Sequence, residues 1–242
     1  MSKVALVTGG TRGIGAAISQ GLKDQGFKVV ANYAGNDEKA QKFASETGIA
    51  VKKFDVSNYD MVSEAVTEIE SAEGPIEILV NNAGITRDGF FHKMKPEQWS
   101  DVINTNLNSM FNVTQPVFVG MRGRGFGRIV NISSINGQKG QAGQTNYSAA
   151  KAGVIGFTKA LAQEGAFKGV TVNCICPGYI NTDMVADIDE KILQKIIAQI
   201  PAGRLGEASE ISALVNYLTS DAAAFMNGAV LSINGAQYLA NG

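Results

Sequence analysis

The amino-acid sequence predicts an α/β fold, a doubly wound parallel sheet of about seven strands with helices on both faces. Short apolar runs rich in Val and Ile recur along the chain, and segments with helical spacing of apolar residues separate them. This alternation indicates parallel strands joined by crossover helices. The runs are apolar almost throughout, which is typical of strands covered on both faces. Right-handed crossovers between such strands produce a doubly wound sheet.

The first half of the chain supplies four of these strands. They are expected at VALVT (4–8), KVVANY (28–33), AVKKFD (50–55) and IEILVN (76–81). Helical spacing of apolar residues predicts helices at 14–25, 38–46 and 58–72. Asp37 and Glu38 stand where the second of these helices opens, and acidic side chains suit a helix N-terminus.

The second half follows the same alternation. Strands are expected at GRIVNIS (127–133), VTVNCI (170–175) and GAVLSI (228–233), and helices at 97–115, 147–165 and 207–219. The chain has no internal repeat and no linker, so residues 1–242 are expected to form a single domain. The least regular stretch, 179–206, is a candidate flap over the substrate.

The composition is that of a soluble globular protein, with 45% hydrophobic and 18% charged residues and a net charge of −1. No run of Lys and Arg is dense enough for nucleic acid, and no apolar run approaches the roughly 18 residues of a membrane span. No signal-peptide pattern opens the chain. Cys174 and Cys176 form neither a CxxC motif nor a second metal pair, so no metal site is expected. We therefore expect a cytoplasmic protein that binds neither nucleic acid nor membranes.

A glycine-rich segment, TGGTRGIG (8–15), lies between the first strand and the first helix. Its glycines allow a tight turn, let the backbone approach a pyrophosphate, and aim free N–H groups of the helix at that group. Two alanines follow in place of the Lys and Ser/Thr of a P-loop. The turn predicts a dinucleotide site of the Rossmann type, with contacts from Gly9, Thr11, Arg12, Gly13, Ile14 and Gly15.

The residues at the end of the second strand bear on the choice of dinucleotide. Proteins that prefer NAD place an acid about 20 residues after the glycines, whereas this strand ends in Asn32 and Tyr33. Arg12 within the turn offers a guanidinium, which suits a phosphate. We therefore expect NADP(H) as the cofactor, with Asn32 and Tyr33 among its contacts. The alternative is that Arg12 is only a surface residue of the turn.

The segment NYSAAKAG (146–153) contains the strongest candidate for proton transfer in a chain with a single histidine, His92. Tyr147 and Lys151 are four residues apart and share one helix face. A tyrosine has a pKa of about 10, and a nearby ammonium is expected to lower this pKa. Tyr147 is then a candidate general acid. A single Y-x-x-x-K arises easily by chance, so the neighbouring motifs decide its meaning.

Seven motifs occur in a fixed order: TGGTRGIG, DV (55–56), NNAG (81–84), NTNL (104–107), NISS (131–134), YSAAK (147–151) and PGYINTDM (177–184). Each lies near the C-terminal end of an expected strand or on an adjoining helix, where open α/β sheets bind ligands. This ordered set resembles the short-chain dehydrogenase/reductase family over essentially the whole chain. The resemblance implies an NADPH-dependent oxidoreductase with a Rossmann-type fold.

The resemblance also implies roles for individual residues. Tyr147 corresponds to the catalytic acid/base, Lys151 to its partner, Ser134 to the hydroxyl that orients the carbonyl, and Asn106 to the proton-relay residue. Besides Tyr147 and Lys151, the implied cofactor contacts are Asp55, Val56, Asn82, Ala83, Gly84, Pro177, Gly178, Ile180 and Thr182. Taken singly, Ser134 could instead be a cap and Asn106 an ordinary polar helix residue.

Two stretches, 81–94 and 133–153, narrow the resemblance to enzymes that reduce 3-oxoacyl thioesters. They resemble the acetoacetyl-CoA reductases, which form (R)-3-hydroxybutanoyl-CoA with NADPH, usually for polyhydroxyalkanoate synthesis. The 3-oxoacyl-carrier-protein reductases of fatty-acid synthesis are the alternative. A dinucleotide sensor without turnover is a weaker one, because such proteins commonly lose the Tyr or the Lys. Candidate substrate contacts are Lys93, Gln138, Gln141, Gln144 and Tyr179.

Two further expectations concern the assembly and the C-terminus. Related enzymes are typically homotetramers joined through the helices after the fourth and fifth strands, for which 97–120 and 147–166 are the candidates here. After Asn234-Gly235 the chain departs from the family, since Ala236 stands where a second glycine is usual.

Overall fold

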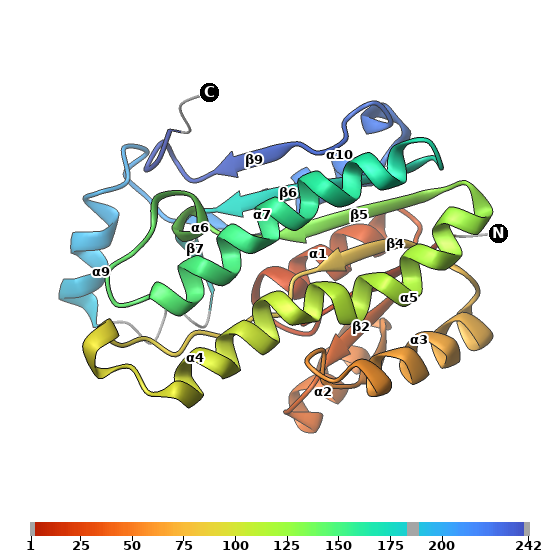
Figure 1. Cartoon of the computed structure of the whole chain (residues 1–242), viewed down its shortest axis with the longest axis horizontal. Coiled ribbons are helices and arrows are strands. Elements are labelled where there is room, and N and C mark those ends of the chain that lie inside the picture. Colours follow the sequence, from red (N-terminus) through yellow and green to blue (C-terminus); the bar gives the residue numbers. More distant parts are fainter. Residues whose placement is uncertain (1–2, 183–188, 240–242) are drawn as a thin grey trace.

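The computed structural model describes residues 3–182 and 189–239, and Figure 1 shows their arrangement. All seven expected strands are confirmed within the described part of the chain, and all pair in parallel. The sheet order is β3-β2-β1-β4-β5-β6-β9. The strands are β1 (Val4–Val7), β2 (Lys28–Tyr33), β3 (Ala50–Lys53), β4 (Ile76–Asn81), β5 (Gly127–Ile132), β6 (Val170–Pro177) and β9 (Val230–Ile233).

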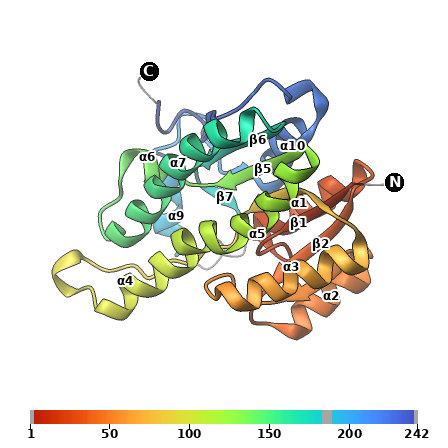
Figure 2. The same cartoon turned by 45° about the vertical axis from the view of Figure 1, so that its right-hand side comes forward.

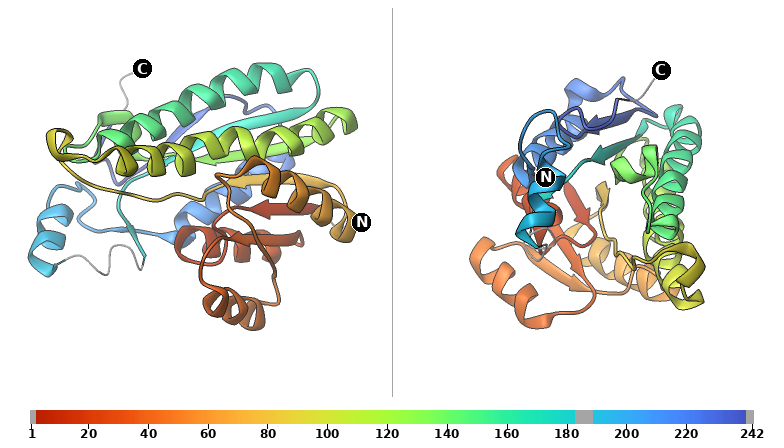
Figure 3. Two further views of the ribbon diagram at one scale, coloured as in Figure 1. Left: turned by 60° about the horizontal axis from the view of Figure 1, so that its bottom comes forward. Right: turned by 90° about the vertical axis from the view of Figure 1, so that its left-hand side faces the viewer.

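Helices cover both faces of the sheet, and each face has its own apolar core. On one face lie α3 (Tyr59–Glu73), α5 (Ser109–Arg124) and α7 (Thr145–Ala166), of which α5 and α7 run side by side in Figure 3. On the other face lie α1 (Gly13–Asp24), α2 (Asp37–Thr47) and α10 (Ala208–Thr219). The doubly wound Rossmann-type sheet that the sequence predicts is therefore confirmed.

The strand order reverses between β1 and β4, and this reversal positions the site. From β1 the chain winds outward to β2 and β3, and then returns to the other side of β1 as β4. Open α/β sheets bind ligands at such a switch point, beyond the carboxyl ends of the strands. In Figure 1 the arrowheads of β4, β5 and β6 point toward this edge, where α6 (Ile135–Lys139) and the start of α7 lie.

A row of buried polar side chains ties α7 to the sheet. Asn81 Nδ2 donates to Asn131 Oδ1 at 2.9 Å, and Asn131 Nδ2 donates to Thr158 Oγ1 at 2.9 Å. All three residues are buried, so these bonds form in a low dielectric and are costly to break. They fix the position of α7 along β5. They therefore also fix the position of the α7 residues that lie at the sheet edge.

The helix expected at 97–115 is confirmed, with a π-helical turn inside it and an end that lies further along the chain, at Arg124. The structure has α4 (Pro96–Ile103), a π-helical turn at Asn104–Asn108, and then α5. Within the turn, Asn106 makes two hydrogen bonds to the backbone of Ile85, in the loop after β4. Such π turns insert a residue into a helix and are frequent at functional sites.

The stretch expected to be irregular, 179–206, contains more regular structure than predicted, although residues 183–188 of the candidate flap lie outside the described part. β7 (Ile180–Asn181) pairs with β8 (Gly206–Glu207), so the two ends of the stretch are joined. Between them, α9 (Glu190–Ile197) has an apolar side but no buried residue. Figure 2 shows α9 beyond the sheet edge, on the side where α4 also lies.

Ala236 adopts a left-handed backbone conformation with φ 66°, next to Gly235 with φ 59°. The left-handed region costs an L-residue roughly 1–2 kcal/mol. Ala236→Gly should therefore raise the free energy of unfolding by up to about 1 kcal/mol, after the larger entropy of glycine in the unfolded chain is subtracted. Chemical denaturation measures the change. Ala224→Gly, at an exposed right-handed position, should lower stability instead, and the same sign for both variants would contradict the argument.

Candidate active site

The glycine turn after β1 packs directly against the edge of β4. Gly9 and Gly13 have φ values of 59° and 51°, in the left-handed region. A Cβ atom on Gly15 would lie 2.0 Å from the carbonyl oxygen of Gly9 and 2.6 Å from Asn82 Nδ2. Since both neighbours belong to the turn and its support, this position accepts only glycine. The open N-terminus of α1 therefore stands close beneath the turn, as a pyrophosphate site requires.

Two asparagines hold this turn in place. Asn32 accepts from the Gly9 N–H at 3.2 Å and donates to the Phe54 carbonyl oxygen at 2.8 Å. Asn82 Nδ2 donates to the carbonyl oxygens of Thr8 and Gly9 at 3.0 and 3.2 Å. Both side chains are thus engaged with the backbone. Their contribution to a dinucleotide site is to hold the glycine turn in its conformation.

Thr8 is a supporting residue that the sequence analysis missed. Its Oγ1 atom accepts from the N–H groups of Asn82 and Ala83, at 3.0 Å each. Thr8 therefore locks the loop after β4 onto β1. The signal for this role in the sequence is the position of Thr8 directly before the first glycine, because a hydroxyl there can bond to the neighbouring strand.

The far end of the turn presents one exposed cation. Arg12 is exposed and precedes the first turn of α1. Tyr33 ends β2, and burial followed by a hydrogen bond to Asp37 raises its pKa. Lys53, which the sequence analysis did not select, forms an ion pair with Asp37 at 2.9 Å. This pairing lowers the pKa of Asp37, chiefly through the Lys53 hydrogen bond.

The other candidate contacts also line the C-terminal edge. Asp55 is exposed, and its Oδ1 accepts from Ser57 Oγ at 2.8 Å, while Val56 is buried. A Cβ atom on Gly84 would meet Asn106 Oδ1 at 2.7 Å and Lys151 Nζ at 3.6 Å. Gly84, a candidate cofactor contact, therefore lies next to two of the candidate catalytic residues. The remaining members lie within the glycine-rich segment or at and after the end of β6: Thr11, Ile14, Pro177, Gly178, Ile180 and Thr182.

Ser134, Tyr147 and Lys151 come together at the end of β5. Tyr147 and Lys151 lie on α7, with Lys151 Nζ 5.7 Å from the centre of the Tyr147 ring. The Ser134 side chain, which also caps α6, hydrogen-bonds to the Tyr147 hydroxyl. Lys151 is only 3% exposed and donates to the Ile132 carbonyl oxygen at 2.8 Å. The Tyr147 phenol, the Ser134 hydroxyl and the buried Lys151 amine therefore lie close together.

Asn106 lies fully buried next to this group, in the π turn. Its Oδ1 accepts from the Ile85 N–H at 2.8 Å, and its Nδ2 donates to the Ile85 carbonyl oxygen at 2.8 Å. The side chain therefore holds the loop after β4 against the π turn, with one acceptor site and one N–H group left over.

The expected direction of the Tyr147 pKa is wrong. Burial raises the pKa of Tyr147, the charge of Asp88 raises it further, and the Ser134 hydrogen bond only partly opposes these effects. Burial also lowers the pKa of Lys151 to about 8, so its ammonium is itself disfavoured. Desolvation is thus the largest cause of the shift in both side chains. A raised pKa keeps Tyr147 a neutral phenol at pH 7, which is the form that can donate a proton.

Of the five candidate substrate contacts, two lie close to Asp88 and three do not. Gln144 donates to Asp88 Oδ2 at 2.8 Å and Tyr179 feels the charge of the same carboxylate, so these two lie near the mouth of the site. Gln141 pairs with Lys139 at 3.4 Å, and Lys93 is exposed on the loop after β4.

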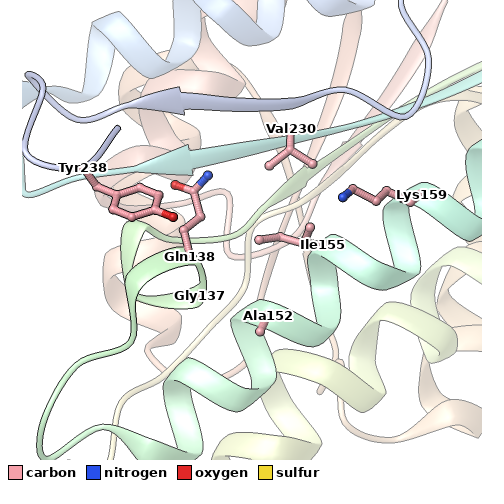
Figure 4. A pocket seen from close by; sticks show the side chains of 7 residues that line it. All are labelled: Gly137, Gln138, Ala152, Ile155, Lys159, Val230 and Tyr238. Carbon is pink, nitrogen blue, oxygen red and sulfur yellow. The ribbon is translucent and has the colours of Figure 1, made fainter. Parts of the chain in front are cut away.

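Gln138 lies apart from the catalytic cluster. Its amide exchanges hydrogen bonds of 3.0 and 3.1 Å with Ser232 on β9. It lines a surface cavity of about 370 Å³ together with Ile155, Lys159 and Tyr238 (Figure 4). From α7 this cavity is lined by Ala152, Ile155 and Lys159, and neither Tyr147 nor Lys151 is among its lining residues.

Asn146 is a second residue that the sequence analysis missed. It is fully buried, its Oδ1 accepts from the Tyr147 N–H at 2.8 Å, and its Nδ2 donates to the carbonyl oxygens of Arg87 and Gln98 at 3.0 and 2.8 Å. It therefore anchors the first turn of α7 to the loop after β4 and to α4. Its place directly before Tyr147 was the only signal in the sequence.

Replacing Lys151 with methionine should change how stability depends on pH. The pKa of Lys151 is about 8 in the fold, against 10.5 normally, so between these values the unfolded chain holds a proton that the folded protein has released. The free energy of unfolding of the wild type should therefore rise with pH in this window, by up to ~3 kcal/mol. Lys151→Met should lack this rise.

Denaturant unfolding at several pH values between about 7 and 10 measures this difference. Lys159→Met, which removes an exposed lysine from the same helix, is the control for the loss of one charge. Equal slopes in the wild type and in Lys151→Met would contradict the lowered pKa of Lys151.

Comparison with known proteins agrees with this geometry. A family model described as short chain dehydrogenase matches residues 3–193. The chain is 65% identical over 239 residues to an acetoacetyl-CoA reductase of Shinella zoogloeoides, covering 98% of this chain and 99% of the relative. It is 64% identical over 241 residues to one of Rhizobium meliloti, covering 99% and 100%. A 3-oxoacyl-[acyl-carrier-protein] reductase of Vibrio cholerae is 45% identical over 239 residues, covering 98% of each. The chain belongs to the short-chain dehydrogenase family, whose cofactor is a nicotinamide dinucleotide.

Proposed function

We propose that the protein reduces acetoacetyl-CoA to (R)-3-hydroxybutanoyl-CoA with NADPH. The observation that carries the reaction type is the cluster of Ser134, Tyr147 and Lys151 at a glycine-lined sheet edge. The substrate is supported by the two relatives above 60% identity, both named acetoacetyl-CoA reductase, while the carrier-protein reductase is less similar.

The residues present fit a dinucleotide. Added Cβ atoms at Gly9, Gly15 and Gly84 would lie 3.1, 2.0 and 2.7 Å from neighbouring protein atoms, so these positions stay free of side chains and the turn stays close-packed at the N-terminus of α1. Arg12 is exposed on this turn, and Lys151 Nζ would lie 3.6 Å from a Cβ atom on Gly84. When bound there, the reduced nicotinamide supplies the hydride.

The chain's own side chains handle the oxygen of the 3-keto group. Ser134 donates a hydrogen bond to this oxygen, where negative charge develops as the carbon is reduced. Tyr147 delivers its proton to the same oxygen, and its raised pKa keeps that proton in place at neutral pH. Lys151 has two N–H donors besides the one directed at Ile132. These donors are available to hold the cofactor ribose and to bring a proton back toward Tyr147.

The comparison of two thioesters tests the substrate. We expect kcat/KM to be clearly higher for acetoacetyl-CoA than for acetoacetyl-carrier protein, measured as initial NADPH oxidation. A clear preference for the carrier protein would instead assign the enzyme to fatty-acid synthesis. Binding of NADPH without turnover of either thioester would indicate a sensor.

The cofactor preference is a separate prediction. We expect kcat/KM to favour NADPH over NADH, since no acid ends β2 and Arg12 is free to meet a 2′-phosphate. Arg12→Ala should lower kcat/KM for NADPH roughly 10- to 100-fold, the size of one hydrogen bond to a charged group, and leave NADH almost unchanged. Lys53→Ala is the matched control, because Lys53 is already paired with Asp37. Equal losses with both cofactors would contradict the role given to Arg12.

We further propose a homotetramer, in which α5 and α7 meet their counterparts, working in the cytoplasm in polyhydroxyalkanoate synthesis. Phe111 and Val119, which are 58% and 61% exposed on α5, support such an interface. The two cysteines are free and buried, which suits a reducing compartment. None of the helices in the described ranges is both long and apolar enough to cross a membrane. Light scattering on the purified protein tests the tetramer.

A further inference from the structure

The peptide unit between Lys151 and Ala152 on α7 is held by two residues that flank Ser134 in the chain. Ser133 Oγ donates to the Lys151 carbonyl oxygen at 2.7 Å. A Cβ atom on Gly137, in α6, would lie 2.7 Å from the Lys151 carbonyl carbon and 2.9 Å from the Ala152 nitrogen. Figure 4 shows Gly137 on α6 close to Ala152 on α7. One peptide unit of α7 therefore receives a hydrogen bond from the end of β5 and a backbone contact from α6.

The Ser133 hydroxyl reaches α7 from a fixed point of the sheet. The Ser133 N–H donates to the Ile175 carbonyl oxygen of β6 at 2.8 Å, and the residue is only 3% exposed. A helical carbonyl oxygen already accepts an N–H group of its own helix and has a second lone pair for another donor. Lys151 therefore does not need Ser133 to satisfy its carbonyl group. The bond instead fixes where this turn of α7 lies against the end of β5, to which Lys151 Nζ is also tied through Ile132 at 2.8 Å.

Gly137 is explained by its close contact with α7 and not by its own backbone conformation. It lies within α6 and does not have the positive φ that favours glycine. Inside a helix, glycine is less favourable than alanine. Space is therefore the reason that the structure gives for a glycine here, since any side chain would push α6 away from the Lys151 backbone.

The contact bears on the distance between two catalytic side chains. Ser134 lies in the chain between Ser133 and Gly137, and Tyr147 lies about one helical turn before Lys151. The Ser134 side chain hydrogen-bonds to the Tyr147 hydroxyl. A shift of α7 relative to β5 and α6 would therefore change the geometry of this pair.

We propose that Ser133 and Gly137 are positioning residues, which hold the Lys151–Ala152 peptide unit and thereby set the distance between Ser134 and the Tyr147 hydroxyl. Neither residue has a part in the proposed reaction itself, and the expected effect on rate rests on the proposed function. A displacement of about 1 Å can cost roughly 100-fold in rate, so even a small change in the spacing is measurable.

Ser133→Ala removes the tie between strand and helix. The variant should fold, because the Lys151 carbonyl oxygen keeps its partner within the helix. We expect kcat with acetoacetyl-CoA to fall about 10-fold or more, while KM and the dissociation constant of NADPH change less than about 3-fold. The kinetic isotope effect with NADPH deuterated at the transferred hydrogen should rise, because hydride transfer becomes more rate-limiting.

Ser212→Ala is the matched control for the loss of a buried serine hydroxyl. Ser212 is 5% exposed, and its Oγ donates to the Ala17 carbonyl oxygen of α1 at 2.8 Å. Both variants should lose stability toward denaturant, but Ser212→Ala should keep the wild-type kcat and isotope effect. If Ser133→Ala kept them too, its hydrogen bond would serve stability alone, and the proposal would be overturned.

Gly137→Ala widens the spacing instead of releasing the tie. Ordinary contacts of a Cβ atom begin at about 3.4 Å, so α6 and α7 must separate by about 0.7 Å at this point. We expect kcat to fall at least about 10-fold and the isotope effect to rise. Gly123→Ala, whose Cβ atom would meet nothing within 4 Å, should behave like the wild type. Wild-type kcat in a folded Gly137→Ala would contradict the proposal, and if this variant does not fold, Ser133→Ala decides.

Crystal structures of the variants separate failure of the positioning from failure of the proposed function. The wild-type rate with acetoacetyl-CoA tests the function. The distance between Ser134 Oγ and the Tyr147 hydroxyl oxygen tests the positioning without any substrate. This distance should be longer, or spread over more than one conformer, in Gly137→Ala and Ser133→Ala. The wild-type distance in both variants would refute the proposal, whatever substrate the enzyme reduces.

Discussion

Tyr147→Phe should lower kcat about 10²- to 10⁴-fold, the usual contribution of a positioned general acid, and leave NADPH binding intact. The substitution removes only the hydroxyl that bonds to Ser134, while the ring keeps its place above Lys151. Burial favours the neutral form at this position, so phenylalanine introduces no uncompensated charge. Steady-state kinetics with acetoacetyl-CoA give kcat, and quenching of NADPH fluorescence gives the dissociation constant.

Tyr217→Phe is the matched control, since Tyr217 lies exposed on α10. It should leave both kcat and NADPH binding unchanged. If Tyr147→Phe retained more than about a tenth of the wild-type kcat, another group would have to donate the proton. A loss of NADPH affinity comparable with the loss of kcat would show that Tyr147 serves mainly in binding.

Gly15→Ala should damage both the stability of the protein and its binding of the dinucleotide. The added methyl group would lie 2.0 Å from the Gly9 carbonyl oxygen and 2.6 Å from Asn82 Nδ2. The turn must move, and overpacking of this kind costs roughly 1–3 kcal/mol. Because the same turn approaches the pyrophosphate, we expect NADPH affinity to fall at least tenfold, by the cost of misaligning one or two charged hydrogen bonds. Denaturant unfolding and NADPH titration measure the two effects separately.

Gly123→Ala is the control for adding a methyl group to a helical glycine. A Cβ atom there would meet no other atom within 4 Å, and the residue lies in the last turn of α5. This variant should be as stable as the wild type or slightly more stable. Wild-type stability and NADPH affinity in Gly15→Ala would mean that the turn yields easily, and would contradict the close approach that the structure describes.

Much of the fold could be read from local patterns. All seven strands lie within two residues of their expected starts, because a strand buried on both faces needs an apolar run that the sequence displays directly. The pairing of Tyr147 with Lys151 was equally local, since four residues separate neighbours on a helix face. The glycine turn was predictable for a related reason, because its conformation excludes side chains.

Contacts between distant segments decided the rest. The helix expected at 97–115 contains a π turn in which Asn106 bonds to Ile85, a residue of another loop, and no periodicity within the helix records those bonds. Gln138 lies against Ser232 of β9 for the same kind of reason. Asn32 and Asn82 were selected as cofactor contacts, and only the structure reveals that their side chains support the glycine turn.

The direction of the Tyr147 pKa is the clearest case of a property that the sequence could not determine. The sequence places a lysine one turn away, which by itself would stabilise the phenolate. The fold buries both groups and brings the carboxylate of Asp88 close enough to Tyr147 to raise its pKa. The sequence by itself thus determined which residues meet at the sheet edge. The tertiary structure decided their protonation, because desolvation depends on everything that packs around a group and not on its neighbours in the chain.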